Sequence, residues 1–464
     1  MNFLFRPVHI GSLVFFRIVF GVLAFADIVG VFSYYHLYKN VFDAAGFHFH
    51  YFGFEWLNPL PEPFMSLFFI SMMIAAISIV LGKWYHWSTT WFAFGFTWLF
   101  LLEKTQYLNH GYLFCWLSFV MIFLPAQRWF SLDAKNDPSI RTTEIPLWSL
   151  AILPLLMGMV YFFGGIAKIN PDWLQAMPIK LWLRAKADYW LIGPLISKEP
   201  VAWFMAYGGL ILDLTAAFFI LGKKTRKYTF AAVVFFHFTN LLIFNIGIFP
   251  WLSVALTALF FPADFPLTII ERFKAGNSAF SRFITKNIIL KFKTVPPDHN
   301  AQLWQTSPRW KPIIVAILLI ILVVHIILPL RHHLFEGNVA WTEEGHRYAW
   351  RMMLRSKRGN GTFKVVDALT GKAEEVSPKD YLTKRQNRNI YTHPDMIWEF
   401  AQFLEKEYRA KGWEPRVYAD IFCRANGSNY FRFVDKQVDL AVEPWHFFKH
   451  SHWIIPLEEY TSKE

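Results

Sequence analysis

The stretch IIVAILLIILVVHIILPL, residues 313–330, contains a single ionisable side chain, His325. An α-helix needs about 20 mostly apolar residues to cross the hydrocarbon core of a bilayer. This stretch therefore predicts a transmembrane helix. Similar apolar runs precede it at 10–35, 64–82, 88–102, 112–126, 146–167, 200–222, 228–243 and 246–262. Together they predict an α-helical polytopic membrane protein with about nine transmembrane helices.

The composition supports this class. Only 17% of the 464 residues are charged and 55% are hydrophobic, whereas soluble domains carry about 25% charged residues. The 50 Phe and 21 Trp residues suit side chains that face lipid or lie at its surface. The net charge of +12 could indicate nucleic-acid binding, but the basic residues are distributed over short loops rather than gathered in one patch. We therefore expect no nucleic-acid partner.

The distribution of Lys and Arg also predicts an orientation. These residues concentrate in the loops at 125–145, 223–227 and 263–311, and fewer occur in the alternate loops 36–63 and 168–199. Cytoplasmic loops carry the excess of positive charge in membrane proteins. The N-terminus is then inside and the C-terminus outside, provided that the chain turns between the runs 228–243 and 246–262.

After Arg331 the sequence becomes charged and changes its periodicity. Segments 362–366 and 416–421 alternate as strands do, residues 395–410 have helical spacing, and Asn426-Gly427 is typical of a hairpin turn. This pattern predicts a small α+β domain. The expected division is a transmembrane helical domain at 1–331 and a soluble α+β domain at 332–464 on the non-cytoplasmic face.

Lys168 is a polar residue with two possible roles. It ends the apolar run 146–167 and follows the pair Gly164-Gly165. A lysine at the hydrocarbon edge commonly extends its amine toward water. Alternatively, desolvation lowers its pKa so that the neutral amine acts as a base. The residues alone favour neither interpretation.

Other polar residues occupy costly positions in or near the apolar runs. Asp213 lies within a run, where a role in helix packing is the simpler interpretation. His237 and Asn240 share one helical face, and a hydrogen-bonded buried histidine is the simple alternative to a functional one. Asn109-His110 belongs to a polar cluster at the mouth of two runs. The local histidine clusters lack recognised ligand spacing, so no metal is expected.

Several of these segments occur together in one order between about Arg17 and Leu457, and they resemble the vitamin K-dependent γ-glutamyl carboxylase family. The segments that carry the resemblance are Asn109-His110-Gly-Tyr-Leu, Gly164-Gly165-Ile-Ala-Lys168-Ile-Asn-Pro-Asp172-Trp173, Gly208-Gly-Leu-Ile-Leu-Asp213, Phe236-His237-Phe-Thr-Asn240, Trp341-Thr and Tyr348-Ala-Trp350-Arg-Met352-Met353.

The resemblance implies a specific reaction. Reduced vitamin K reacts with O₂ and ends as the 2,3-epoxide, while a glutamyl residue loses its γ-proton and gains CO₂. Side-chain acid–base catalysis contributes only about 10²–10⁴-fold, so the weakly acidic γ C–H needs a cofactor. The expected cofactors are vitamin K hydroquinone, O₂ and CO₂, and the expected partners are a glutamate-containing peptide or protein and membrane lipid.

The resemblance also implies residue roles. Lys168 is expected to deprotonate the hydroquinone, with Asn109 and His110 near its headgroup. The residues expected to bind the cofactor are His237, Asn240, Met352 and Met353. The residues expected to bind the glutamyl substrate are Arg184, His332, Trp341, His346 and Trp350.

This chain departs from the family in two ways that matter. His346 stands where the family has a tyrosine, and the chain stops at Glu464 where animal enzymes continue, so we do not expect high-affinity propeptide docking. The resemblance favours a compact bacterial version in the inner membrane, with its active site on the periplasmic side, or an endoplasmic-reticulum protein if the source is eukaryotic. Two alternatives stay open: a quinol epoxidase that does not carboxylate protein, and a non-enzymatic quinone-binding membrane protein.

Overall fold

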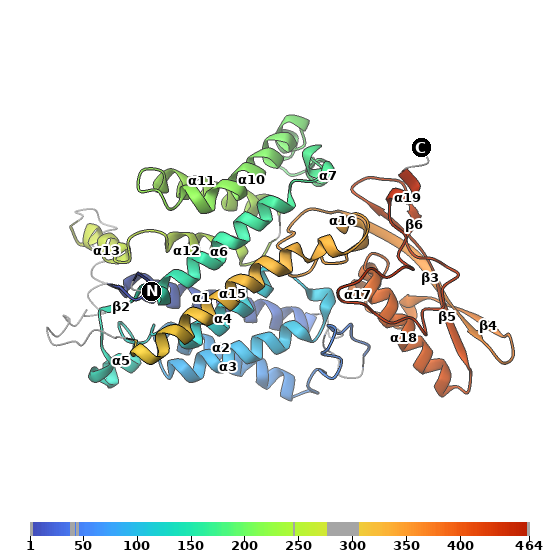
Figure 1. Ribbon diagram of the computed structural model, residues 1–464, viewed down its shortest axis with the longest axis horizontal. Coiled ribbons are helices and arrows are strands. Elements are labelled where there is room, and N and C mark those ends of the chain that lie inside the picture. Colours follow the sequence, from blue (N-terminus) through green and yellow to red (C-terminus); the bar gives the residue numbers. More distant parts are fainter. Residues whose placement is uncertain (1–2, 38–41, 43–45, 245, 276–305, 462–464) are drawn as a thin grey trace.

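A computed structural model describes residues 3–37, 42, 46–244, 246–275 and 306–461. It shows a bundle of helices with a small sheet-containing domain at one end (Figure 1). The principal bundle helices are α1 (Gly11–Leu37), α2 (Phe64–Leu81), α3 (Tyr85–Leu101), α4 (Asn109–Phe123), α6 (Leu147–Ala167), α10 (Glu199–Phe219), α11 (Arg226–Ile243), α12 (Phe249–Ala258) and α15 (Lys311–Leu330).

Each predicted apolar run overlaps one of these helices. In the described part of the chain, 5 helices are long and apolar enough to cross a membrane: those within α1, α2, α6 and α10, and the helical stretch around α15. Helices α4 and α12 are apolar but shorter. The predicted membrane class is therefore supported, whereas the count of about nine crossings stays a prediction.

The loops lie at two opposite ends of the bundle. At one end strand β1 (Pro7–His9) pairs with β2 (Glu144–Pro146), and the Ser12 backbone N–H donates to the Ala263 carbonyl at 2.8 Å. At the other end the loop after α3 contacts the C-terminal domain. There the Lys104 amine lies 3.0 Å from the Asp395 carboxylate. The loops predicted for opposite sides of the membrane are thus separated in space (Figure 1).

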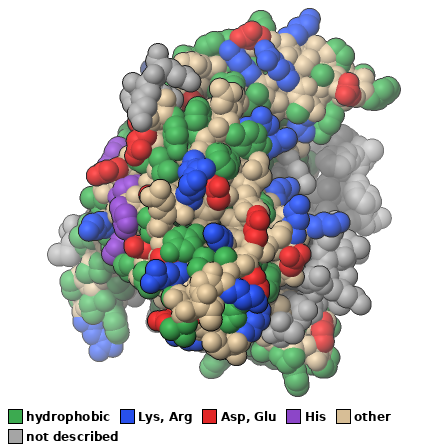
Figure 2. All heavy atoms as spheres, turned by 90° about the vertical axis from the view of Figure 1, so that its right-hand side faces the viewer, with side chains coloured by type: hydrophobic (Ala, Val, Ile, Leu, Met, Phe, Trp, Pro, Cys, Tyr) green, Lys and Arg blue, Asp and Glu red, His purple; other side chains and the backbone are tan. Residues whose placement is uncertain are grey.

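The C-terminal domain contains an antiparallel sheet in the order β4-β3-β5-β6. Its strands are β3 (Lys357–Asp367), β4 (Ala373–Val376), β5 (Pro415–Ala425) and β6 (Phe431–Arg432), and the helices α17 (Lys384–Ile390) and α18 (Pro394–Ala410) accompany them. Side chains of β5 alternate between buried and more accessible positions, as the sequence predicts for a half-buried strand. Seen from this domain's end, hydrophobic, basic and acidic side chains are interspersed (Figure 2).

The turn at Asn426-Gly427 follows β5 and joins the domain to the bundle. Both residues have positive φ, 49° and 90°, as the central residues of a type I′ turn do, and the Ser428 N–H donates to the Ala425 carbonyl at 2.9 Å. The Asn426 side chain donates to the Asp172 carboxylate at 2.7 Å and accepts from the Ser356 N–H at 2.8 Å. The predicted turn is therefore also a contact with the loop that follows Lys168.

We expect Asn426→Ala to lower the free energy of unfolding by about 1–3 kcal/mol, because buried partners lose their hydrogen bonds. Thermal unfolding of the purified protein measures this effect. The matched control is Asn429→Ala, since Asn429 is exposed three residues further on. Equal unfolding midpoints for the two variants would contradict the structural role of Asn426.

Candidate active site

Lys168 and Asp213 form a buried ion pair at the end of α6. The Lys168 amine lies 2.6 Å from the Asp213 carboxylate and donates to the Gly164 carbonyl at 3.2 Å. Their side chains are only 6% and 5% exposed. The ring of Trp173 lies 5.3 Å from the amine. The amine is therefore sheltered from water and held in one position, while its catalytic role stays a prediction.

Two glycines allow this pair to form. A Cβ atom on Gly165 would lie 2.7 Å from the Leu214 backbone nitrogen, so only glycine lets α6 and α10 approach this closely. That approach brings Asp213 to Lys168. A Cβ on Gly164 would lie 3.4 Å from the Met352 side chain and 3.5 Å from the Asp213 carboxylate. Met352 thus reaches α6 at Gly164, beside the Asp213 carboxylate. We name residues 343–353, which follow α15, the covering segment.

Two predicted histidines lie further along the same bundle. The His237 ring is 3.0 Å from the Tyr161 hydroxyl, and Tyr161 shares a helical face with Gly164 and Lys168. The other ring nitrogen of His237, Nδ1, is buried and has no hydrogen-bond partner among the residues described. His110 stacks on Phe249 at 5.9 Å, and His237 meets the same ring edge-on at 5.7 Å. Phe249 therefore links the two histidines.

The remaining predicted bundle residues have different surroundings. The Asn109 side chain accepts from the Tyr107 hydroxyl at 3.0 Å, and that hydroxyl accepts from the Tyr348 N–H at 2.7 Å. Asn109 is thus linked to the covering segment through the Tyr107 hydroxyl. Asn240 lies one turn beyond His237 on α11 and is half-buried.

The covering segment has an unusual backbone. Glu343, Tyr348, Trp350 and Met353 all have φ between 54° and 67°, a region that costs non-glycine residues about 1–3 kcal/mol each. Such conformations cluster at ligand sites. Trp350 is 1% exposed and its indole Nε1 has no hydrogen-bond partner in the described chain. Met352 lies close to Gly164, whereas Met353 is 39% exposed.

The predicted substrate residues do not gather in one place. Arg184 is exposed at the end of α8 (Ile179–Arg184). Trp341 lies in the core of the C-terminal domain and donates to the Ile455 carbonyl at 2.8 Å. The His332 ring bonds the Pro329 carbonyl at 2.8 Å. Trp350 belongs to the bundle core, and His346 lines a separate pocket. Their substrate roles stay predictions.

The pocket that contains His346 is rich in cationic side chains, and we name it the cationic pocket. It has a volume of about 220 Å³, and no acidic side chain is among the described residues that line it. The basic side chains that line it are Lys104, Arg347, Arg355, Arg385 and Arg388, with His346 and His393. None of these five arginine and lysine residues was singled out from the sequence. Only the i, i+3 spacing of Arg385 and Arg388 could have indicated a shared face.

Electrostatics keep the two histidines of the cationic pocket neutral. Burial lowers the pKa of His346 well below its ordinary value, and the neighbouring Arg355 lowers it further. Burial and Arg347 lower the pKa of His393 to about 4, against the opposing effect of Glu343. Both rings are therefore uncharged at neutral pH and can accept a hydrogen bond.

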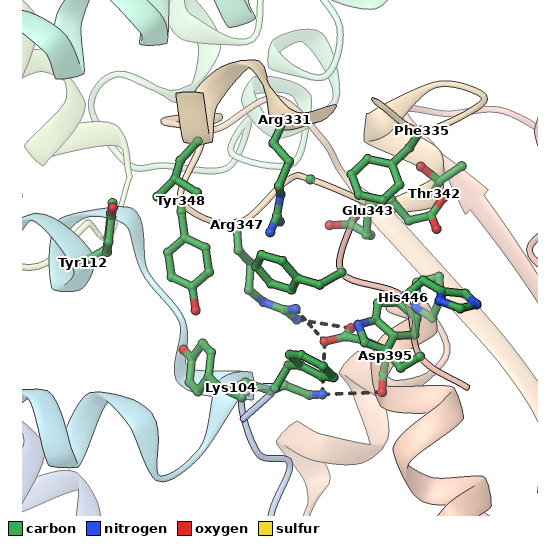
Figure 3. A pocket seen from close by; sticks show the side chains of 18 of the residues that line it. Lys104, Tyr112, Arg331, Phe335, Thr342, Glu343, Arg347, Tyr348, Asp395 and His446 are labelled. Carbon is green, nitrogen blue, oxygen red and sulfur yellow. Dashed lines mark hydrogen bonds and ion pairs between the residues drawn. The ribbon is translucent and has the colours of Figure 1, made fainter. Parts of the chain in front are cut away.

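A second pocket of about 370 Å³ lies beside the cationic pocket and shares Lys104 and Arg347 with it (Figure 3). We name it the aromatic pocket, because Tyr112, Tyr348 and Phe447 are among the rings that line it. Asp395 lines the aromatic pocket and pairs with Lys104 and Arg347, the two residues that both pockets share. Burial alone would raise the pKa of Asp395, but Arg347 and Lys104 hold that pKa well below the usual range. Lys168 is not among the described residues that line either pocket.

The described residues contain no group of three His, Cys, Asp or Glu side chains arranged to hold a metal ion. Two protein-family models match most of the chain. The HTTM domain matches residues 5–265, and the vitamin K-dependent gamma-carboxylase lumenal domain matches residues 310–460. No solved structure matches the chain. The first match covers the bundle from β1 to α12, and the second covers α15 and the C-terminal domain; the chain belongs to the vitamin K-dependent gamma-carboxylase family.

Proposed function

We propose that this protein converts vitamin K hydroquinone to the 2,3-epoxide and couples that oxidation to γ-proton removal and CO₂ addition on glutamyl residues. The observation that carries the proposal is the buried Lys168–Asp213 pair beneath Met352. It lies where membrane helices meet the C-terminal domain. A lipid-soluble quinol can reach that boundary from the bilayer, and a peptide can reach it from water.

Lys168 would act as the base toward a quinol hydroxyl. In this role the neutral amine accepts the hydroxyl proton at Nζ and becomes the ammonium, so the Lys168–Asp213 ion pair corresponds to the state after the transfer. The Asp213 carboxylate and the Gly164 carbonyl already lie within hydrogen-bond distance of Nζ, so they stabilise the protonated product. Because the pair is buried, these contacts are stronger than they would be in water.

The polar atoms around the pair suit a quinol. The His237 Nδ1 and the Trp350 Nε1 are buried and have no hydrogen-bond partner within the described part of the chain. Such atoms are costly unless a ligand or water satisfies them. His110 and Asn109 would complete the polar surroundings of the ring, and Met352 would exclude water. Reduced vitamin K, on reaction with O₂, would supply the strong base that side chains lack.

The cationic pocket would hold the glutamyl carboxylate. Arg385 and Arg388 have no carboxylate partner among the described residues, whereas Arg355 pairs with Glu343. Arginine binds carboxylates through two parallel hydrogen bonds. The neutral His346 ring lies in the same pocket. Carboxylation adds a second negative charge to the glutamyl side chain. The basic side chains of the cationic pocket would bind this product as well.

A direct assay tests this function. Purified protein in lipid nanodiscs, given vitamin K hydroquinone, O₂, labelled bicarbonate and a glutamyl peptide, should yield both epoxide and labelled peptide. The substitution of His346 for the family's tyrosine favours the alternative, an epoxidase without carboxylation, and epoxide without label over varied peptides would establish it. If neither product forms, the non-enzymatic quinone-binding alternative is favoured.

The proposal also includes a location. The charge distribution favours a C-terminal domain on the outside, so the reaction would occur on the periplasmic face of a bacterial inner membrane. Accessibility of an introduced cysteine at exposed Asn429 to a membrane-impermeant reagent in intact cells distinguishes the two orientations.

A further inference from the structure

Arg331 has an unusual environment at the end of the last bundle helix. It directly follows α15 and is 7% exposed. Two of its guanidinium nitrogens, Nε and Nη1, are buried and make no hydrogen bond to any residue described. A buried guanidinium is costly to desolvate unless an anion or other acceptors pair with it. The helix C-terminus is favourable for a cation, but it does not satisfy these N–H groups.

The Arg331 side chain lines the aromatic pocket. Figure 3 shows it extending into the pocket from the side opposite Lys104. Its guanidinium lies 3.9 Å from the centre of the Phe447 ring. A cation–π contact uses the face of the guanidinium and leaves the N–H edge available for a second partner.

No acidic side chain among the described residues that line the pocket remains to neutralise Arg331. The acidic side chains that line the pocket are already in ion pairs: Asp395 with Lys104 and Arg347, Glu343 with Arg355 and Lys357, and Glu344 with His450. The cationic Arg347 lines the same pocket. An incoming anion would therefore meet one unpaired guanidinium beside further positive charge.

Part of the pocket wall is apolar and belongs to the membrane helices. Tyr112 and Trp116 come from α4 and Leu328 comes from α15. Phe52, which lines the pocket, is 55% exposed, and Leu334, close to Arg331 in the chain, is 61% exposed. Exposed apolar side chains around a hollow mark a contact with lipid or with a partner.

We propose that the aromatic pocket binds a membrane lipid that carries a single negative charge on a phosphodiester headgroup, with Arg331 pairing to the phosphate. The apolar walls would hold the first part of the acyl chains. A lipid fits better than a peptide carboxylate because the pocket lies against two membrane helices and because its accessible rim is apolar. The site is separate from the Lys168–Asp213 pair and does not depend on the proposed reaction.

Thermal unfolding in detergent tests the proposal, because a ligand that binds only the folded protein raises the midpoint. The probe is dihexanoyl phosphatidylglycerol, compared with dihexanoyl phosphatidylcholine, inorganic phosphate and a glutamyl tripeptide. We expect a saturable rise with phosphatidylglycerol and at least tenfold weaker binding of the other three. Arg331→Gln should weaken phosphatidylglycerol binding by at least tenfold. The matched control, Arg309→Gln, removes an exposed arginine before the opposite end of α15 and should leave binding unchanged.

Other outcomes overturn the proposal. Equal phosphatidylglycerol binding by wild type and Arg331→Gln would remove Arg331 from the site. Arg331-dependent binding of the tripeptide or of inorganic phosphate with the same affinity as the lipid would assign the pocket to a different ligand. If Arg331→Gln does not fold, Arg331→Lys is used instead, because it keeps the charge; it should still bind phosphatidylglycerol more tightly than phosphatidylcholine. If neither the wild type nor Arg331→Lys prefers phosphatidylglycerol, the lipid assignment is contradicted.

Discussion

Lys168→Ala is expected to reduce the rate of vitamin K epoxide formation by about 10²–10⁴-fold, the usual contribution of a positioned acid or base. The label incorporated into a glutamyl peptide should fall by the same factor, because both products depend on the first proton transfer. The measurement is the nanodisc assay with both products followed together. The matched control is Lys180→Ala, since the Lys180 amine pairs with the half-exposed Glu199 at 2.6 Å. Such surface pairs contribute about 0–1 kcal/mol.

Folding must be separated from catalysis in this experiment. Lys168→Ala leaves the Asp213 carboxylate buried without its partner, which costs about 3–5 kcal/mol in comparable proteins. The double variant Lys168→Ala/Asp213→Ala removes both charges and should recover most of the lost thermal stability while remaining inactive. Epoxide formation near the wild-type rate in a folded double variant would exclude Lys168 as the base.

The helices could be predicted because their signal is local. Length and apolar composition identified the runs that became α1, α2, α6, α10 and α15, and the Asn-Gly turn identified the end of β5. The Lys168–Asp213 pair could not be predicted as a pair. The two residues are 45 positions apart, and only the close approach of α6 and α10 at Gly165 brings them together.

The cationic pocket was missed for a related reason. Its side chains come from the loop after α3, from the segment 346–355 and from α17, and no local pattern shows that these meet. A single sequence also does not distinguish a tryptophan that binds substrate from one that packs. Trp341, expected near the substrate, is 1% exposed in the core of the C-terminal domain and meets Phe433 edge-on.

The buried environments of Arg331 and His325 could not be predicted from their residue types. From the sequence, Arg331 only marks the end of the last apolar run, and a snorkelling arginine would reach water there. The structure buries it against Phe447 instead. His325 is 1% exposed and stacks on Trp350 at 6.0 Å. Neither environment follows from hydropathy, because the covering side chains come from distant segments.

Arg385→Gln is expected to lower kcat/KM for the glutamyl peptide by at least about 30-fold, since truncating one partner of a charge pair costs about 2–5 kcal/mol. The loss should appear in label incorporation more than in epoxide formation, because Lys168 and Asp213 are untouched. Arg385 is suitable for this test because the hydrogen bond that its side chain makes to the described residues, to the Thr105 carbonyl at 3.3 Å, is long. The matched control is Arg358→Gln, an exposed arginine on β3. If both variants lose label and epoxide equally, or if neither loses label, the glutamyl carboxylate is not bound in the cationic pocket. A selective loss of label in Arg385→Gln would show that separate groups of side chains serve oxidation and carboxylation.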